Sequence, residues 1–228
     1  MCSRYFLDAD GNVIAYTFAV HENTLVRRRY NIAPTQDAPV VRVGAGGGRE
    51  MPLLRWGLVP PWARELSAGT KMINARSEGV ESKPAFRAAL RERRCLVPAS
   101  GFYEWKGAPG RKQPYAITLA ERPLFAFAGL WESWQPRGGE PVQTFTILTT
   151  EANQAVASVH DRMPMILRRE DEEAWLTGSA EEALAILKPH AGEMRLRAVN
   201  RRMGSTSLEG PECLDDAGPG WGEQQELL

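Results

Sequence analysis

The sequence predicts one α+β domain, built around an antiparallel, barrel-like β core with helices at its periphery. Short runs of β-branched and aromatic residues follow one another through the middle of the chain, separated by turn-forming Gly and Pro residues. Apolar residues at helical spacing occur in fewer places. The chain has 228 residues, enough for one large domain with a substantial core, and it shows neither an internal repeat nor a long linker.

The expected strands begin near the middle of the chain. The stretch "RCLVPASGFYEW" predicts a strand pair, and "QPYAITLA" and "PLFAFAGLWESW" predict two strands joined by the turn "ERP". "RGGEPVQ" then leads into the strand "TFTILTT", and "MRLRAVN" predicts a late strand. These segments follow each other closely, so we expect consecutive antiparallel hairpins.

Three helices are expected beside the strands. Residues 83–94 carry apolar residues at helical spacing after an early proline. Residues 169–178 and 179–190 predict two short amphipathic helices separated at Gly178, and the second begins with a Ser-x-x-Glu capping pattern. Helices this short need a packed face to be stable, so we expect them to lie against the β core.

The last part of the chain differs in composition from the rest. From Gly204 onward it is rich in Gly, Pro, Asp and Glu, and it offers few large apolar residues for a core. We therefore expect the domain to span residues 1–214 and residues 215–228 to form a flexible tail.

Composition narrows the classes of function. The 28 basic and 28 acidic residues cancel, so net charge neither favours nor excludes nucleic acid, whose binding depends on the local field. No apolar run approaches the roughly 20 residues that a membrane-spanning helix needs. The three cysteines are scattered and odd in number, which favours a reducing, intracellular location over a disulfide framework. No Cys/His pair has metal-ligand spacing, so we expect no metal, no cofactor and no membrane partner.

The second residue, Cys2, could offer two reactive groups, an amine and a thiol. If Met1 is removed, Cys2 carries a free α-amine with a pKa of about 8 and a thiol with a pKa of about 8.5, on neighbouring carbons. An aldehyde can condense with the amine to an imine, and the thiolate can then add to the same carbon to close a five-membered thiazolidine. The ordinary alternative is that a cysteine at this position is incidental.

Three other segments carry candidate site residues. In "INARSE", Asn74 and Arg76 lie on the same side if the segment is extended. In "GFYEW", Glu104 lies between two aromatic residues, which would desolvate it and raise its pKa toward the range for acid–base catalysis. In "HDRMP", His160 precedes Asp161 and Arg162. A surface carboxylate and a structural histidine are the ordinary alternatives for Glu104 and His160.

These segments occur with others in one characteristic order. The ordered set resembles the SOS-response-associated peptidase (SRAP) family, whose bacterial and eukaryotic members shield abasic sites in single-stranded DNA. The resemblance runs from Cys2 to about Leu214. Each motif alone is weak, but the order is specific: "MC", "RRYNIAPTQ", "RWGLVPPW", "INARSE", "CLVPASGFYEW", "TILTTEAN", "HDRMP" and "VNRR…GPECL".

The resemblance implies a role for each catalytic candidate. Cys2, exposed by removal of Met1, forms the thiazolidine with the ring-opened abasic sugar. Asn74 lines the pocket and hydrogen-bonds near the nucleophile. Glu104 and His160 move protons during ring opening, imine formation and ring closure. Met1 is removed either autocatalytically, which would make the protein a peptidase, or by a host aminopeptidase, and lyase activity at abasic sites is a further implied activity.

The resemblance also implies a compact SRAP fold with a positively charged groove that binds single-stranded DNA. Such a groove fits the general mode of single-strand binding, which combines a track of basic residues with aromatic side chains that stack on the bases. The ordinary alternative is that tryptophans lie in the core and arginines are solvated. The residues that match the family's DNA contacts are the motif residue Arg4, the phosphate-binding Arg76 and Arg162, the base-packing Pro34 and Trp62, and the groove residues Asn31, Trp105 and Thr149.

One position departs from the family pattern. The family usually begins Met-Cys-Gly-Arg, whereas residue 3 here is Ser. Glycine allows backbone angles and a close DNA approach that serine restricts, so we expect a modest effect on fit and an intact mechanism. The resemblance further implies a monomer that acts in the cytoplasm, associated with the nucleoid if the source is bacterial.

Two other function classes stay open from the sequence. An N-terminal-nucleophile amidohydrolase of the glutaminase type also exposes an N-terminal cysteine, and glutamine hydrolysis with ammonia release would reveal it. A non-covalent single-strand binder would bind intact and abasic DNA equally and leave no covalent adduct.

Overall fold

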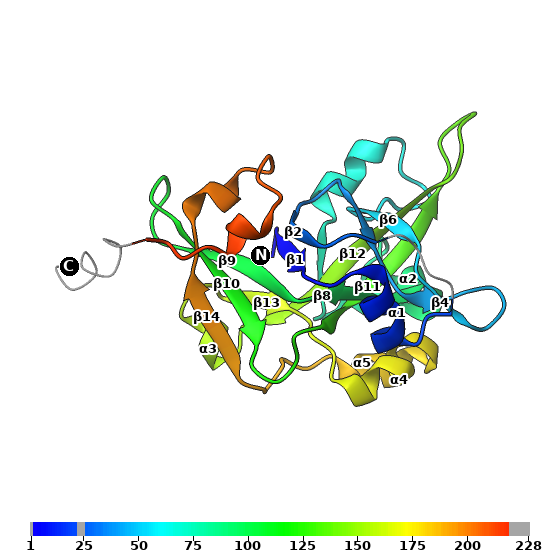
Figure 1. The fold of residues 1–228 in the computed structure, drawn as a ribbon. Coiled ribbons are helices and arrows are strands. Elements are labelled where there is room, and N and C mark those ends of the chain that lie inside the picture. Colours follow the sequence, from blue (N-terminus) through cyan, green and yellow to red (C-terminus); the bar gives the residue numbers. More distant parts are fainter. Residues whose placement is uncertain (1, 22–25, 219–228) are drawn as a thin grey trace.

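Two β-sheets form the framework of the protein in the computed structural model, which describes residues 2–21 and 26–218 (Figure 1). The first sheet is antiparallel, with the strand order β14-β10-β9-β1-β2. The N-terminal strand β1 therefore lies inside the sheet, which fixes the position of the residues just before it. The strands are β1 (Tyr5–Leu7), β2 (Arg29–Ile32), β9 (Gly101–Lys106), β10 (Gln113–Leu119) and β14 (Met194–Ala198).

The second sheet is mixed. Its strand order is β3-β6-β12-β11-β8, and β7 and β13 also pair with β12. The long strand β12 runs parallel to β6 and β7 but antiparallel to β11 and β13. The strands are β3 (Asp37–Pro39), β6 (Leu53–Trp56), β7 (Asn74–Arg76), β8 (Arg94–Ala99), β11 (Phe125–Trp134), β12 (Val142–Glu151) and β13 (Arg162–Pro164), with β4 (Arg42–Val43) and β5 (Arg49–Glu50) forming a separate pair.

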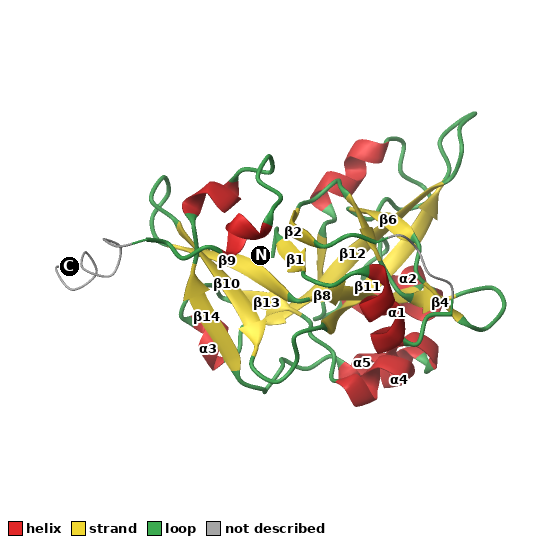
Figure 2. Cartoon of the chain, viewed as in Figure 1, coloured by secondary structure: helices red, strands yellow, loops and turns green. Residues whose placement is uncertain are grey.

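Short helices surround the sheets (Figure 2). Figure 1 shows α4 and α5 packed together at one end of the molecule, near α1, and α3 beside β14. The α-helices are α1 (Gly11–Phe18), α2 (Arg87–Glu92), α3 (Gln154–Ala157), α4 (Glu172–Thr177) and α5 (Ala180–Ile186), and the 3-10 helices are η1 (Leu66–Lys71), η2 (Val80–Ser82), η3 (Arg169–Asp171), η4 (Arg201–Gly204) and η5 (Pro211–Leu214).

The α+β prediction is confirmed, and so are the strand segments read from the sequence. The expected consecutive hairpins are only partly observed: β9 pairs with β10 and β11 with β12, whereas β8 and β9, like β10 and β11, lie in different sheets. Each predicted strand corresponds to an observed one, and residues 179–190 begin with the expected capping box between Ser179 and Glu182. The barrel-like description of the core holds only loosely, because the strand path of each large sheet has two open ends within the described ranges. The expectation of an antiparallel core is also incomplete, since β12 has two parallel neighbours.

Tyr5 joins the two sheets. Its ring lies 5.3 Å from that of Trp56 on β6 and 5.9 Å from that of Phe127 on β11, in edge-to-face arrangements between ring centroids. Side chains alternate along a strand, so Phe6 points to the other face and packs against Tyr103 in a smaller apolar cluster. This alternation holds β1 between the main core and the C-terminal segment.

The sequence reading did not include helix α1. Asp10 caps its start, with one carboxylate oxygen accepting hydrogen bonds from the backbone of Asn12 and Val13. Ile14 and Phe18, one turn apart, are fully buried on its inner face. The cap and this apolar spacing were the available sequence signals for the helix.

The backbone just beyond residue 214 still pairs with the segment that follows β14. The backbone N–H of Asn200 donates to the carbonyl of Asp215 at 2.8 Å, and Asp216 forms a β-bridge with Val199. The predicted tail from 219 onward lies outside the described residues. Within the part that the structure describes, no helix is both long and apolar enough to cross a membrane, and no cluster of His, Cys, Asp and Glu could hold a metal ion.

Candidate functional site

The register of two strands places the N-terminal residues. Tyr5 of β1 pairs with Phe102 of β9, Phe6 pairs with Gly101, and the backbone N–H of Tyr103 donates to the carbonyl of Arg4 at 3.0 Å. In an antiparallel pair, one step along one strand is matched by one step back along the other. Continuing the register therefore places Ser3 opposite Glu104, next to Cys2.

Cys2 is buried and held by the second sheet. The Asn74 side chain on β7 donates from Nδ2 to the Cys2 carbonyl oxygen at 2.6 Å, and the Cys2 thiol donates to the Arg4 carbonyl at 3.5 Å. Burial strongly raises the pKa of the thiol, and the negative charge of Glu104 raises it further. In this closed arrangement the thiol is protonated, so it needs a proton acceptor before it can act as a nucleophile.

A pocket of about 420 Å³ lies next to these residues. It brings together four residues singled out from the sequence, which are Arg4, Glu104, Trp105 and His160. Cys2 and Asn74 do not line it, but Cys2 directly precedes the lining residue Ser3, and Asn74 is hydrogen-bonded to Cys2. The sequence reading missed two further lining residues, Lys112 from the β9–β10 hairpin and Gly204 from η4, since neither belongs to a quoted motif. The lining is completed by Ser3.

Glu104 is the buried carboxylate of this pocket. Its residue is only 3% exposed, and burial raises its pKa from 4.5 to about 7. The sequence reading attributed this desolvation to both aromatic neighbours. Trp105 does line the pocket, but Tyr103 and Trp105 both pack in the apolar cluster around Phe6, because side chains two residues apart on β9 share the face opposite to that of Glu104. At neutral pH the carboxyl therefore exists in both protonation states, which suits a group that transfers protons.

His160 lies at the end of the α3–β13 connection. Its backbone N–H donates to the carbonyl of Val156 at 2.9 Å, and its Nδ1 accepts from the backbone N–H of Arg162 at 3.0 Å. Partial burial lowers the pKa of the ring, although the Asp161 carboxylate, 2.8 Å from Nδ1, opposes that shift.

Three of the predicted DNA contacts lie together on the second sheet. Thr149 on β12 is opposite Arg76 of β7 on one side and Pro164 of β13 on the other. The Arg76 side chain is exposed, whereas Arg162 is buried and forms a two-point ion pair with Glu78. Their contact with DNA stays a prediction.

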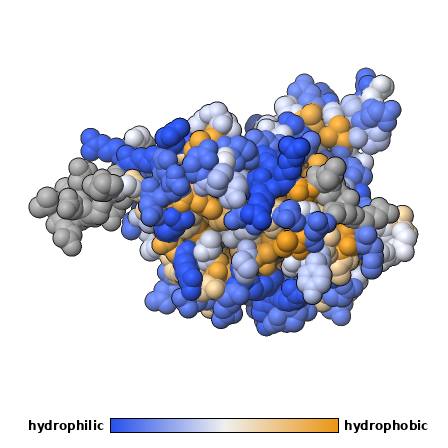
Figure 3. Space-filling view, viewed as in Figure 1, coloured by the Kyte–Doolittle hydropathy of each residue, from blue (hydrophilic) through white to orange (hydrophobic). Residues whose placement is uncertain are grey.

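The other predicted contacts are dispersed. Asn31 is fully buried, and its Nδ2 donates to the carbonyls of Met203, Ser205 and Leu208 at 2.8–2.9 Å. It thus holds the C-terminal segment that carries Gly204 to the pocket. Trp62 is 65% exposed, and Pro34 is half-buried. Figure 3 shows the face of the molecule that is turned to the reader in Figure 1, with hydrophilic residues gathered near its middle.

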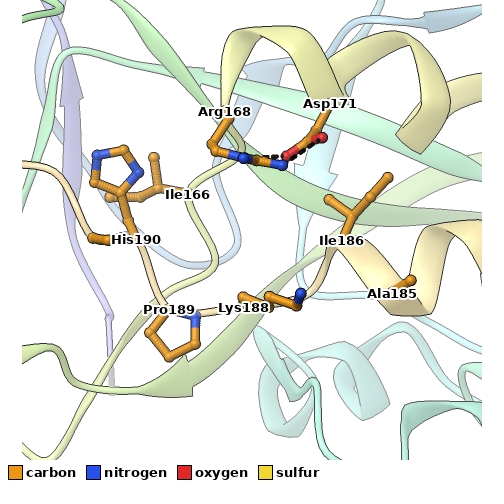
Figure 4. A pocket seen from close by; sticks show the side chains of 9 residues that line it. Ile166, Arg168, Asp171, Ala185, Ile186, Lys188, Pro189 and His190 are labelled. Atoms are coloured by element: carbon orange, nitrogen blue, oxygen red, sulfur yellow. Dashed lines mark hydrogen bonds and ion pairs between the residues drawn. The ribbon is translucent and has the colours of Figure 1, made fainter.

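A second hollow, of about 300 Å³, lies elsewhere, between the β13–α4 region and the α5–β14 connection (Figure 4). It contains none of the residues singled out from the sequence. Of its two cationic side chains, Arg168 is already hydrogen-bonded to the carboxylate of Asp171 at 2.6 and 3.0 Å, and Lys188 is the other.

Comparison with known proteins gives one consistent result. The family model described as SOS response associated peptidase (SRAP) matches residues 1–206. Abasic site processing proteins YoaM and YoqW of Bacillus subtilis (strain 168) are 42% and 38% identical over 223 residues, covering 94% of this chain and 98% and 99% of theirs. Abasic site processing protein HMCES of Gallus gallus is 32% identical, covering 82% of this chain and 66% of its own.

Solved structures share the same fold. A protein from Bacteroides thetaiotaomicron has a TM-score of 0.85 at 26% sequence identity, and the alignment covers 95% of this chain and all of the other. A protein from Bordetella bronchiseptica has a TM-score of 0.77 at 29% identity, covering 87% of this chain. The overall fold is therefore shared by proteins that are less than 30% identical to this chain.

Proposed function

This chain belongs to the SOS response associated peptidase family, and on that premise we propose that it is an abasic site processing protein that shields abasic sites in single-stranded DNA through a covalent bond to Cys2. The observation that carries the proposal is the arrangement around Cys2. Asn74 fixes its carbonyl, and the pocket beside it contains Glu104, whose pKa of about 7 fits proton transfer. His160 completes the pocket.

The proposed reaction begins once Met1, which lies outside the described residues, has been removed. The released α-amine of Cys2 adds to the aldehyde carbon of the ring-opened sugar, and loss of one water gives an imine. The Cys2 sulfur then adds to the imine carbon, and the thiol proton ends on the ring nitrogen after transfer through the site. The product is a five-membered thiazolidine, and one water is the only group released.

Glu104 and His160 divide the proton transfers. The abasic sugar exists mostly as a closed hemiacetal, so its opening needs a proton on the ring oxygen and removal of one from the anomeric hydroxyl. A carboxyl with a pKa of about 7 supplies the acid form in part of the molecules and the base form in the rest. Neutral His160, whose pKa burial lowers, acts as the complementary group.

DNA binding in this proposal uses one molecule of the protein and a single strand. Arg76 and Arg162 contact phosphates, Trp62 and Trp105 stack against bases, and Arg4 lies beside the sugar. The exposed Trp62 supports this assignment, because a tryptophan left 65% exposed has a free face for stacking. Removal of Met1 by the protein itself, and strand cleavage at the abasic site, are further activities of the same proton carriers.

The test mixes the protein with a single-stranded oligonucleotide that carries one abasic site and separates the products on a denaturing gel. An intact strand of the same sequence is the control, and an abasic duplex tests strand preference. We expect a heat-stable, slower-migrating species with the abasic single strand alone. Equal binding of both single strands without a covalent species would favour a non-covalent binder, and release of ammonia from glutamine would favour an amidohydrolase.

A further inference from the structure

Arg162 is a buried cation whose two terminal nitrogens are hydrogen-bonded within the protein, whereas its Nε has no hydrogen-bond partner among the described residues. Its two terminal nitrogens each lie 2.8 Å from one oxygen of the Glu78 carboxylate, and Nη2 also donates to the Thr149 carbonyl at 2.8 Å. The Arg162 side chain is 11% exposed, whereas that of Glu78 is 51% exposed. Glu78 is therefore the solvent-accessible partner of this ion pair.

The Glu78 carboxylate has the geometry of a phosphate at this position. A guanidinium binds carboxylate and phosphate through the same two-pronged pattern of parallel hydrogen bonds. Glu78 follows Arg76 by two residues and is hydrogen-bonded to Arg162, so it is close to both arginines assigned to phosphates. Both arginines lower the pKa of its carboxyl, Arg162 most strongly, so Glu78 is ionised at neutral pH.

Glu78 also has room to move. It belongs to the short connection between β7 and η2, whose backbone is anchored by the Ser77 N–H donating to the Thr149 carbonyl at 2.8 Å. Its side chain lines a hollow of about 350 Å³, together with residues of β12 and α5. The carboxylate can therefore leave Arg162 by side-chain rotation, while the backbone stays in place.

We propose that Glu78 is an internal stand-in for a DNA phosphate, which occupies Arg162 in the free protein and is displaced by a phosphate of the bound strand. The inference rests on the proposed function, because it needs a single strand in the groove. Arg162 stays paired before and after the exchange, which avoids leaving a buried charge alone.

The exchange would also select the ligand. A small free anion must compete with a carboxylate tethered beside Arg162, which has a high effective concentration. A phosphate within a strand is itself held nearby by contacts at Arg76 and along the groove. Glu78 therefore lowers the affinity for any single strand while keeping Arg162 closed to isolated anions.

The test measures the affinity of an intact single strand for Glu78→Gln, with Glu151→Gln as the matched control. Glu151, on β12, is exposed and lines the same hollow. It differs from Glu78 in the feature under test, because Arg162 is hydrogen-bonded to the carboxylate of Glu78. We expect Glu78→Gln to bind about two- to fivefold more tightly than wild type, the range for an exposed ion pair. The control should change less, and thermal unfolding of each variant checks that it is folded.

A double-mutant cycle shows whether Glu78 acts through Arg162. In an Arg162→Ala background, the gain from Glu78→Gln should fall to that of the control. Weaker or unchanged binding by Glu78→Gln would overturn the inference, as would an equal gain in both backgrounds. The proposed function fails separately, if wild-type protein forms no covalent species with the abasic strand.

Discussion

Two carboxylates on neighbouring sheets differ in what their surroundings do to them. Glu104 on β9 is buried in the pocket beside Cys2, and its pKa is raised to about 7. Glu78, after β7, is half-exposed and paired with Arg162, and its pKa is lowered. Loss of water favours the neutral acid in the first case, and a paired cation favours the anion in the second. The comparison separates a carboxyl whose pKa suits proton transfer from one that stays ionised at neutral pH.

The largest effect is expected from removing the proposed nucleophile, Cys2, which lies beside the Glu104 pocket. Cys2→Ala should abolish the stable adduct with abasic single-stranded DNA, because neither the thiazolidine nor an equivalent ring can form. Non-covalent binding should persist, since the proposed phosphate contacts, Arg76 and Arg162, lie on the second sheet. Denaturing gels and binding isotherms measure the two properties. Cys213→Ala, which removes another buried thiol, is the matched control and should still form the adduct.

The next largest effect is expected from replacing the proposed proton carrier, Glu104. Glu104→Gln should slow adduct formation by about 10²- to 10⁴-fold, the usual contribution of general acid–base catalysis. The endpoint should approach that of wild type on long incubation, because the thiazolidine contains no part of Glu104. A time course measures the rate, with Glu151→Gln as a control of equal charge change. A wild-type rate in Glu104→Gln would remove this residue from the proton transfers.

The same residue predicts how stability depends on pH. The pKa of Glu104 is 4.5 in an exposed chain and about 7 in the folded protein, so the folded state favours the protonated carboxyl. Its stabilising contribution is complete below pH 4.5 and is lost as pH rises through 7, by up to about 3 kcal/mol. Urea unfolding at about pH 5 and pH 8 should show Glu104→Gln gaining stability relative to wild type at the higher pH. A difference that does not vary with pH would contradict the assigned pKa.

The smallest effect is expected from removing one charge, that of Arg76, near Glu78 on the second sheet. Arg76→Ala should weaken binding of all single-stranded sequences alike and reduce the slope of log K against log salt by about 0.7, the value for one phosphate contact. The adduct rate at saturating DNA should change little, because Arg76 is not in the pocket beside Cys2. Arg87→Ala, on the exposed side of α2, is the control. An unchanged slope in Arg76→Ala would exclude a phosphate contact.

The sequence predicted those parts of the fold that local pattern determines. The long strands β11 and β12 were visible because their β-branched and aromatic runs are bounded by turns. The parallel pairing of β12 with β6 and β7 was not visible, because it joins segments far apart in the chain. The sheets also stay open where a barrel-like core was expected.

Some residues of the candidate site could likewise be predicted from the sequence, and others could not. Cys2, Glu104 and His160 stood out because their residue types and neighbours suggest chemistry, and the fold brings the last two into one pocket. Glu78 and Lys112 did not stand out. The partnership of Glu78 with Arg162 depends on β7 and β13 both pairing with β12, which no local pattern contains.

The mass of the adduct tests the central claim most directly. The intact covalent complex with an abasic single strand should have the mass of the protein lacking Met1 plus that of the strand, minus one water. It should form without a reductant and keep its mass when treated with borohydride, because a thiazolidine contains no imine to reduce. An adduct that retains Met1, or that survives only after borohydride treatment, would contradict the assignment of Cys2 as both amine and thiol donor.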